Sequence, residues 1–197
     1  MRPRRVPVLG RDSGRPRMVV AGLGNPGSRY RNNRHNAGRM AAERLAEISE
    51  VIEEDSWREG TLALARCEGE TFLILNPRTY MNLSGRPVSA VLKAYGISPE
   101  NLIVIHDDID IPLGAVKKKF EGGTAGHKGL DSIVERLGRK DFMRVRIGVG
   151  RPPEGEDPAD YVLSDFTSNE AEAARAAVTE AADTAVGMMT EIRGEQA

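Results

Sequence analysis

The chain of 197 residues is 40% hydrophobic and 29% charged, as expected of one globular domain with a core. No run of about 18 apolar residues occurs, so the sequence predicts no membrane-spanning helix. The single cysteine, Cys67, excludes an internal disulfide, and with three histidines it makes a zinc site unfavourable. We therefore expect a cytoplasmic protein.

The net charge of −1 hides a strong asymmetry along the chain. Residues 1–17 hold six Arg against Asp12, 111–151 hold 10 basic and 4 acidic residues, and 152–197 hold 2 basic and 11 acidic. A basic block inside the fold beside an acidic tail indicates a local contact with a polyanion. Two solvated faces of opposite charge explain the counts equally well.

Residues 1–17 have no apolar periodicity, which predicts a disordered basic arm ahead of a domain over 18–197. A short buried strand over 18–23 opens this domain, and apolar residues at helical spacing follow from Ala37. The same rules predict strands over 61–66, 71–76, 102–105, 115–120 and 143–149, helices around 88–95 and 130–137, and a C-terminal helix over 168–193.

Strands that alternate with helices favour an α/β fold. We expect a single-domain sandwich with a mixed, mostly parallel, twisted sheet packed by helices. The short gaps at 67–70 and 106–114 are the places where antiparallel pairing is expected.

The first predicted strand runs into "VVAGLGNPGSRYRNNRHNAG", where Gly22, Gly24 and Gly27 match the G-x-G-x-x-G pattern of dinucleotide-binding loops. That pattern requires a helix that opens at the glycines. Here the helical pattern begins about ten residues later, and Pro26 interrupts the motif. We therefore reject this interpretation.

Ligands of open α/β folds bind beyond the carboxyl ends of the strands. The polar residues expected near those ends are Asn25 and His35 after the first strand, Asn82 after 71–76, Asp107 after 102–105, and His127 and Lys128 in the loop "EGGTAGHKG".

A histidine and an aspartate without a protein nucleophile suit water as the attacking group. Asn side chains can donate to a developing oxyanion without adding charge. This combination predicts hydrolysis of an acyl ester or amide without a metal. Other interpretations remain for single residues: Asn82 as a helix cap, the lysines of 117–119 as a solvated edge, and "HDDID" as a Mg²⁺ site. We disfavour the magnesium site because adjacent strand residues point to opposite faces.

Four segments, "GLGNPGSRYRNNRHNAG", "PRTYMNLSG", "HDDIDIPLGAVKKKFEGGTAGHKGL" and "FMRVRIGVGRP", together resemble the bacterial-type peptidyl-tRNA hydrolases. The resemblance covers about residues 18–166. It implies a monomeric enzyme without a cofactor that cleaves the ester between a peptide and the 3′-terminal ribose of tRNA. Its partner would be peptidyl-tRNA, bound through the acceptor stem and 3′ end.

The resemblance also implies roles for single residues. His35 would be the catalytic base and Asp107 its orienting partner. Asn25 and Asn82 would hold the peptide end and support the oxyanion, and Tyr30 would lie near the terminal nucleotide. The residues that it places on the tRNA phosphates are Lys117, Lys119 and Arg146.

One position departs from the family pattern. The family usually has Asn where this chain has Lys128, and a charged lysine donates hydrogen bonds but cannot accept them. Lys128 would contact substrate or mark a weakened enzyme. The alternative hypothesis is therefore a catalytically weak paralogue that acts as an RNA-binding accessory protein.

Overall fold

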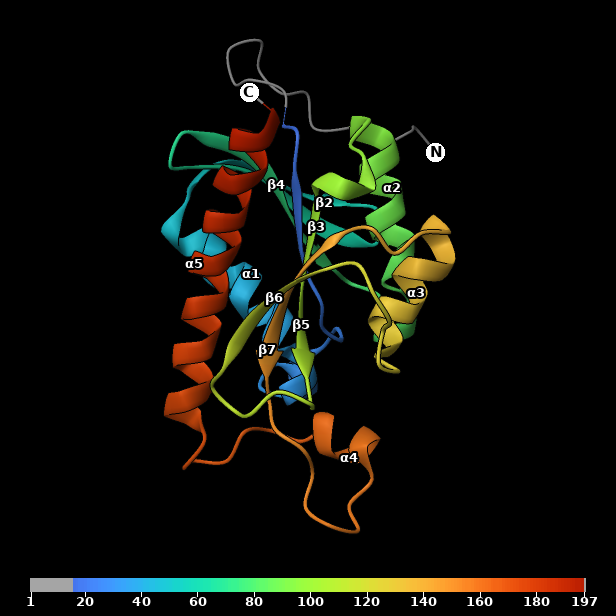
Figure 1. Cartoon of the computed structure of the whole chain (residues 1–197), viewed down its shortest axis with the longest axis vertical. Helices are drawn as coiled ribbons and strands as arrows, with labels where there is room; N and C mark the ends of the chain where they lie inside the picture. The colour runs from blue at the N-terminus through green and yellow to red at the C-terminus, as the bar shows by residue number, and fades with distance from the viewer. Residues whose placement is uncertain (1–15, 197) are drawn as a thin grey trace.

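The computed structural model describes residues 16–196, so nearly all of the basic arm expected over 1–17 lies outside the described residues. Within 16–196, seven strands form one sheet in the order β2-β3-β4-β1-β5-β7-β6 (Figure 1). The strands are β1 (Val19–Gly22), β2 (Glu50–Trp57), β3 (Gly60–Cys67), β4 (Glu70–Pro77), β5 (Leu102–Asp108), β6 (Val116–Phe120) and β7 (Met143–Gly148).

The four central strands β4, β1, β5 and β7 run parallel. The outer strands β3, β2 and β6 are antiparallel to their neighbours, so the mixed sheet of the sequence prediction is confirmed. β5 is buried along its whole length, from Leu102 to Asp108. Its first four residues are apolar on both faces because helices cover both sides of the sheet, and its last three are polar although buried.

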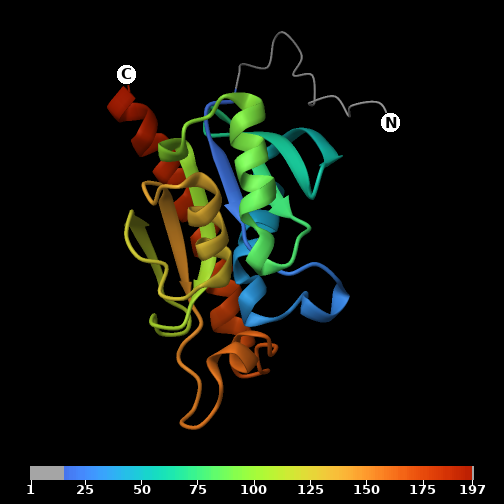
Figure 2. The ribbon, with the colours of Figure 1, turned by 90° about the vertical axis from the view of Figure 1, so that its right-hand side faces the viewer.

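The helices form two layers, with α1 (Ala37–Ile48) and α5 (Ala171–Gln196) on one face and α2 (Gly85–Tyr95) and α3 (Lys128–Leu137) on the other (Figure 2). The remaining elements are α4 (Pro158–Val162) and the 3-10 turns η1 (Ser28–Tyr30), η2 (Arg34–Asn36), η3 (Met81–Leu83) and η4 (Pro99–Asn101). No helix within residues 16–196 is long and apolar enough to cross a membrane.

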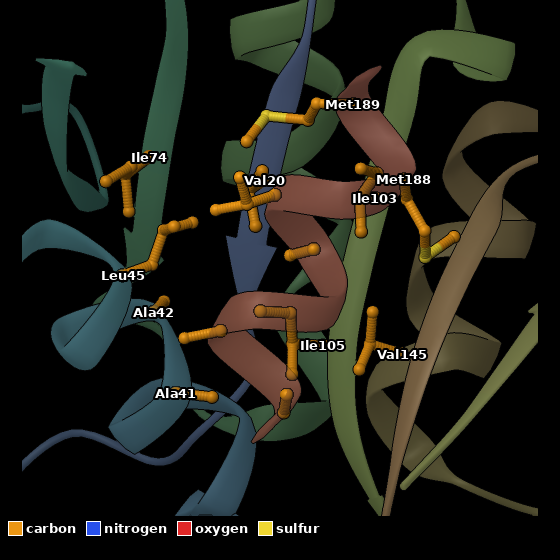
Figure 3. Packing of buried hydrophobic residues seen from close by; sticks show 14 of the residues in the cluster. Val20, Ala41, Ala42, Leu45, Ile74, Ile103, Ile105, Val145, Met188 and Met189 are labelled. Atoms are coloured by element: carbon orange, nitrogen blue, oxygen red, sulfur yellow. The ribbon is translucent and has the colours of Figure 1, made fainter. Parts of the chain in front are cut away.

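Alternate residues of each central strand supply the two cores. Ile103, Ile105 and Val145 pack with Leu45 of α1 and Met189 of α5 (Figure 3). Their neighbours Leu102 and Val104 face α2 and α3. The period-2 alternation of a strand therefore explains why both faces need helices.

Two elements were missed by the sequence analysis. β2 has seven of its eight residues exposed, and four of them are acidic, so no apolar alternation marks it as a strand. It forms because the backbone of β3 offers a paired edge. The short helix α4 was not predicted either, and α5 begins at Ala171 instead of 168.

The expected pairing across 106–114 is wrong in one respect, because β7 lies between β5 and β6. β6 is antiparallel to β7, so the chain leaves β6 at the edge opposite to the end of β5. Residues 121–127 then cross back over the sheet to the start of α3 (Figure 1). The buried Arg144 holds this crossing, since its guanidinium donates to the carbonyl oxygens of Gly122 and Gly123, each at 2.8 Å.

α1 begins at Ala37, ten residues after Gly27, as the sequence predicts. Its second residue, Gly38, lies directly against the sheet. A Cβ at Gly38 would stand 2.2 Å from the carbonyl oxygen of Ile105 and 2.9 Å from the amide nitrogen of Leu23. The absence of a side chain therefore lets the start of α1 reach the ends of β1 and β5.

We expect Gly38→Ala to lower the free energy of unfolding by about 1–3 kcal/mol, because the methyl group must displace backbone. The matched control is Gly187→Ala in α5, where a Cβ would meet no atom within 4 Å. That change should raise stability by about 0.5–1 kcal/mol through helix propensity. Urea unfolding of both variants measures the difference; equal effects would contradict the close approach of α1.

Candidate active site

A pocket of about 720 Å³ opens at the edge of the sheet where β1 and β5 end. All six residues expected in catalysis or substrate binding line it: Asn25, Tyr30, His35, Asn82, Asp107 and Lys128. The pocket is also lined by Met81, by the crossing segment at 124–127, and by α4 with its flanks. Elements far apart in the sequence therefore meet at this edge.

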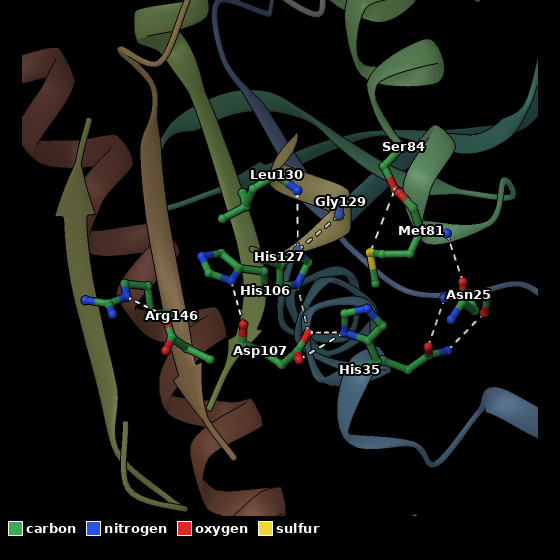
Figure 4. Close-up of polar contacts among 12 residues, drawn as sticks. Asn25, His35, Met81, Ser84, His106, Asp107, His127, Gly129, Leu130 and Arg146 are labelled. Carbon is green, nitrogen blue, oxygen red and sulfur yellow. Dashed lines mark hydrogen bonds and ion pairs between the residues drawn. The ribbon is translucent and has the colours of Figure 1, made fainter. Parts of the chain in front are cut away.

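His35 and Asp107 form a buried pair at the base of the pocket (Figure 4). The Nδ1 atom of His35 lies 2.9 and 3.0 Å from the two carboxylate oxygens of Asp107. Since the carboxylate can only accept, Nδ1 carries the proton and Nε2 has the free lone pair. No residue that the structure describes makes a hydrogen bond to Nε2, which leaves it available to a ligand in the pocket.

The environment makes this histidine a stronger base than usual. Burial alone lowers the pKa of His35, but the charge and hydrogen bond of Asp107 outweigh burial and raise the pKa above 6.5. Burial likewise favours neutral Asp107, yet the pKa of Asp107 lies below its usual range because His35 and His127 face the carboxylate. Asp107 is therefore ionised, and its charge is directed at two imidazoles.

His127, to which the sequence assigns no role, also contacts Asp107. Its Nδ1 accepts from the backbone N–H groups of Gly129 and Leu130 at 3.1 and 3.3 Å, capping the start of α3. The proton must then sit on Nε2, which donates to Asp107 at 3.0 Å. A histidine just before a predicted helix was the available signal, but only the fold shows which carboxylate it meets.

His106 completes a row of three imidazoles. Its ring centroid lies 4.9 Å from that of His127, and that of His127 lies 4.9 Å from that of His35. Burial, together with the charge of the neighbouring His127, lowers the pKa of His106 to about 3. Nδ1 donates to the backbone oxygen of Asp107 at 2.6 Å. The imidazole of His106 is thus uncharged, and it contacts His127 from outside the pocket lining.

The two asparagines differ in how firmly they are held. Asn25 is buried, and its Oδ1 accepts from the backbone N–H of Met81 at 2.8 Å, so its Nδ2 is the donor end of a fixed amide. The side chain of Asn36 makes reciprocal hydrogen bonds with the Asn25 backbone at 2.9 and 3.0 Å. Asn82 is exposed in η3 at the pocket wall.

Tyr30 and Lys128 lie at the mouth. The Arg29 guanidinium packs 4.4 Å from the ring centroid of Tyr30 and hydrogen-bonds its hydroxyl. Lys128 is exposed at the first position of α3, directly after His127. It adds a positive charge to the pocket lining without taking part in the His35–Asp107 pair.

Lys117, Lys119 and Arg146 lie outside the pocket lining but beside it. Lys117 pairs in register with Arg146 across β6 and β7, so both side chains project from one face of the sheet, and Lys119 projects from that face too. Nε of Arg146 donates to Asp108 at 2.8 Å, next to Asp107. A basic stripe therefore runs up to the strand that carries the buried carboxylate.

The magnesium alternative finds no support in the directions of the carboxylates. Asp107 faces the two histidines, Asp108 pairs with Arg146, and Asp110 pairs with Arg151. Nδ1 of His35, an oxygen of Asp107 and Nε2 of His127 do lie close enough together to hold a metal ion. Hydrogen bonds among these same atoms already account for that arrangement.

Comparison with known proteins places the chain in a family. The family model described as peptidyl-tRNA hydrolase matches residues 19–196. The chain belongs to the peptidyl-tRNA hydrolase family. Among its curated relatives, the peptidyl-tRNA hydrolase of Nocardia farcinica is 46% identical over 84% of this chain and 86% of its own. That of Frankia casuarinae is 49% identical over 77% of each chain. The crystal structure of peptidyl-tRNA hydrolase from Acinetobacter baumannii superposes with a TM-score of 0.83, at 34% identity, over 90% of this chain and 91% of the other.

In this member of the family, the arrangement is suited to proton transfer from a bound water. A base with a raised pKa faces an accessible pocket, a fixed carboxylate stabilises its protonated form, and uncharged amides stand nearby. The prediction from sequence that His35 and Asp107 would meet is confirmed in geometry. Their roles in a reaction remain a proposal.

We expect Asp107→Asn to lower the pKa of His35 below 6.5, because burial then acts without the opposing charge. An NMR titration of the histidine ring resonances measures this. The matched control is Asp108→Asn, one residue along, whose carboxylate binds Arg146 and not His35. A His35 pKa that falls equally in both variants would contradict the specific pairing.

Proposed function

We propose that this protein hydrolyses the ester bond between the peptide and the 3′-terminal ribose of peptidyl-tRNA, returning tRNA from stalled or aborted translation. The observation that carries the proposal is the free Nε2 of His35, held against Asp107 at the base of a large pocket, in a chain of the peptidyl-tRNA hydrolase family. The family and the fold support the substrate, and the geometry supports the chemistry.

The reaction needs no protein nucleophile. Nε2 of His35 accepts a proton from water as the water oxygen attacks the ester carbonyl carbon, and Asp107 stabilises the resulting imidazolium. The tetrahedral intermediate then collapses with cleavage of the bond to the ribose 3′ oxygen. His35 returns its proton to that oxygen, so the products are a peptide carboxylate, with its proton released to solvent, and free tRNA.

The amides complete the site. Nδ2 of Asn25 donates to the peptide end of the substrate or to the developing oxyanion, because its Oδ1 is already engaged by Met81. Asn82 acts from the pocket lining next to Met81, where its exposed side chain is free to turn toward the substrate. Preorganised donors of this kind stabilise charge that appears only in the transition state.

The tRNA contact follows the basic stripe. In this proposal Lys117, Lys119 and Arg146 bind phosphates of the acceptor stem, while Tyr30 and Lys128 meet the 3′ end at the pocket mouth. Lys128 then acts as a substrate contact, in place of the family's usual asparagine. The active species is proposed to be a cytoplasmic monomer that works without a cofactor.

The decisive experiment measures release of labelled peptide from N-acetyl-aminoacyl-tRNA by the purified protein and by His35→Ala. We expect turnover by the wild type, none above buffer by the variant, and tRNA affinity within a few-fold of the wild type. Asn32→Ala, an exposed residue of the same loop, is the control and should retain activity. Tight tRNA binding without wild-type turnover would favour the weak paralogue instead.

The double variant Lys117→Ala, Lys119→Ala should weaken tRNA binding and reduce its salt dependence by about two phosphates' worth of slope. The matched control is Lys118→Ala, because Lys118 faces the other layer and pairs with Glu191 of α5 at 2.6 Å. Binding isotherms over a range of salt concentrations measure the slopes. An unchanged slope in the double variant would move the tRNA contact to another surface.

A further inference from the structure

Arg34, which directly precedes His35 in the chain, is a buried cation with only 4% of its side chain exposed. Its Nη1 donates to the hydroxyl of Ser164 at 2.7 Å and to the backbone oxygen of Asp165 at 2.6 Å. Its Nη2 donates to the carboxylate of Glu170 at 2.6 Å. A charge taken out of water is costly unless all of its partners stay in place. The guanidinium therefore ties the residue before His35 to a segment about 130 residues away.

Backbone contacts strengthen the same connection. The N–H of Arg34 donates to the backbone oxygen of Ser164 at 3.1 Å. Asn33 forms an isolated antiparallel bridge with Asp165, and its side-chain amide donates to the carboxylate of Asp165 at 2.7 Å. Both residues ahead of His35 are thus fixed to the chain at 164–165, and His35 follows within the turn η2.

The other end of the tied segment forms a wall of the pocket. Residues 157–159 together with Val162 and Leu163 line it. The ring of Tyr161 stacks on the Arg34 guanidinium, with its centroid 4.3 Å from Cζ, and its hydroxyl donates to the backbone oxygen of Val149 at 2.8 Å. The residue directly before His35 is thus also in contact with the segment that lines the pocket.

Glu170 extends the connection to α5. Its carboxylate also accepts from the backbone N–H and the hydroxyl of Thr167, at 2.7 and 2.8 Å, just ahead of the helix. A planar guanidinium can donate in several fixed directions at once, whereas a lysine ammonium is a single point charge. The number and directions of these contacts therefore require an arginine at this position.

We propose that Arg34 is a positioning residue for the hydrolysis, which holds the ring of His35 against Asp107 and sets the 157–163 wall over it. This inference rests on the proposed function, in which His35 is the general base. Arg34 touches no reacting atom, and it acts through the backbone of the residue that follows it.

The test compares Arg34→Gln and Arg34→Lys with Tyr161→Phe in single-turnover and steady-state hydrolysis of N-acetyl-aminoacyl-tRNA. We expect Arg34→Gln to lower kcat about 10- to 100-fold, the effect of a small misplacement of a catalytic group. Arg34→Lys should recover part of that loss. Tyr161→Phe keeps the ring on Arg34 but releases the wall from Val149, so it should change KM and leave kcat close to the wild type.

A second readout does not depend on turnover. The titratable groups that face His35 are Asp107 on β5 and His127 ahead of α3, and the adjacent residue Arg34 is paired with Glu170. Removal of the Arg34 charge alone would raise the pKa of His35, whereas a loosened contact with Asp107 would lower it. NMR titration of Arg34→Gln should show a fall.

Three results for Arg34→Gln would each overturn the proposal. The first is a wild-type kcat, including the case in which only KM changes, as in Tyr161→Phe. The others are an unchanged pKa of His35 and a raised one. If Arg34→Gln fails to unfold cooperatively, Glu170→Gln carries the test, since Glu170 is 22% exposed and milder to change. Like Arg34→Gln, it should lower both kcat and the pKa of His35, and no change in either would overturn the proposal. A wild-type protein without hydrolase activity would refute the proposed function, while the His35 titration would still decide the positioning.

Discussion

The site depends on one buried negative charge, the carboxylate of Asp107. An ionised group with 3% of its side chain exposed is tolerated only when hydrogen-bond donors surround it. The imidazoles of His35 and His127 supply those donors from two loops that lie far apart in the sequence. Loss of either imidazole removes one of these donors, so the ionisation of Asp107 is coupled to the placement of the two loops that carry His35 and His127.

The sheet explains why these groups meet at one edge. β1 and β5 are adjacent and parallel, so Asn25, His35 and Asp107 follow from strands that end together. His127 needs a further device, because it comes after a strand that runs the other way. Arg144 provides it by holding the crossing segment on the sheet through backbone carbonyl groups. Two buried arginines, Arg34 and Arg144, thus hold the loops on which the polar centre is built.

The elements with a regular apolar pattern could be predicted from the sequence, and few of the others could. The spacing of apolar residues predicts strands such as β5 and helices such as α1. Because ligands of open α/β folds bind beyond the carboxyl ends of the strands, the sequence also predicts that Asp107 and His35 lie near each other. β2 has no such pattern, since its partner and not its side chains makes it a strand. The contact of His127 with Asp107 depends on the return path of residues 121–127, which neither spacing nor composition encodes. The burial of Arg34 could not be predicted for the same reason. An arginine is expected at the surface unless its partners are known, and those of Arg34 are distant in the sequence.

The order of the strands also gives the molecule a polarity. The exposed acidic strand β2 is at one end of the sheet, and the three lysines of β6 are at the other. Opposite charges at the two ends of a rigid sheet form an electric dipole that lies in its plane. In the proposed function, the lysines of β6 attract the phosphates of an approaching tRNA, and the acidic residues of β2 at the far end of the sheet repel them. The sheet that supports the site thus also orients the encounter, and added salt weakens that orientation at long range first.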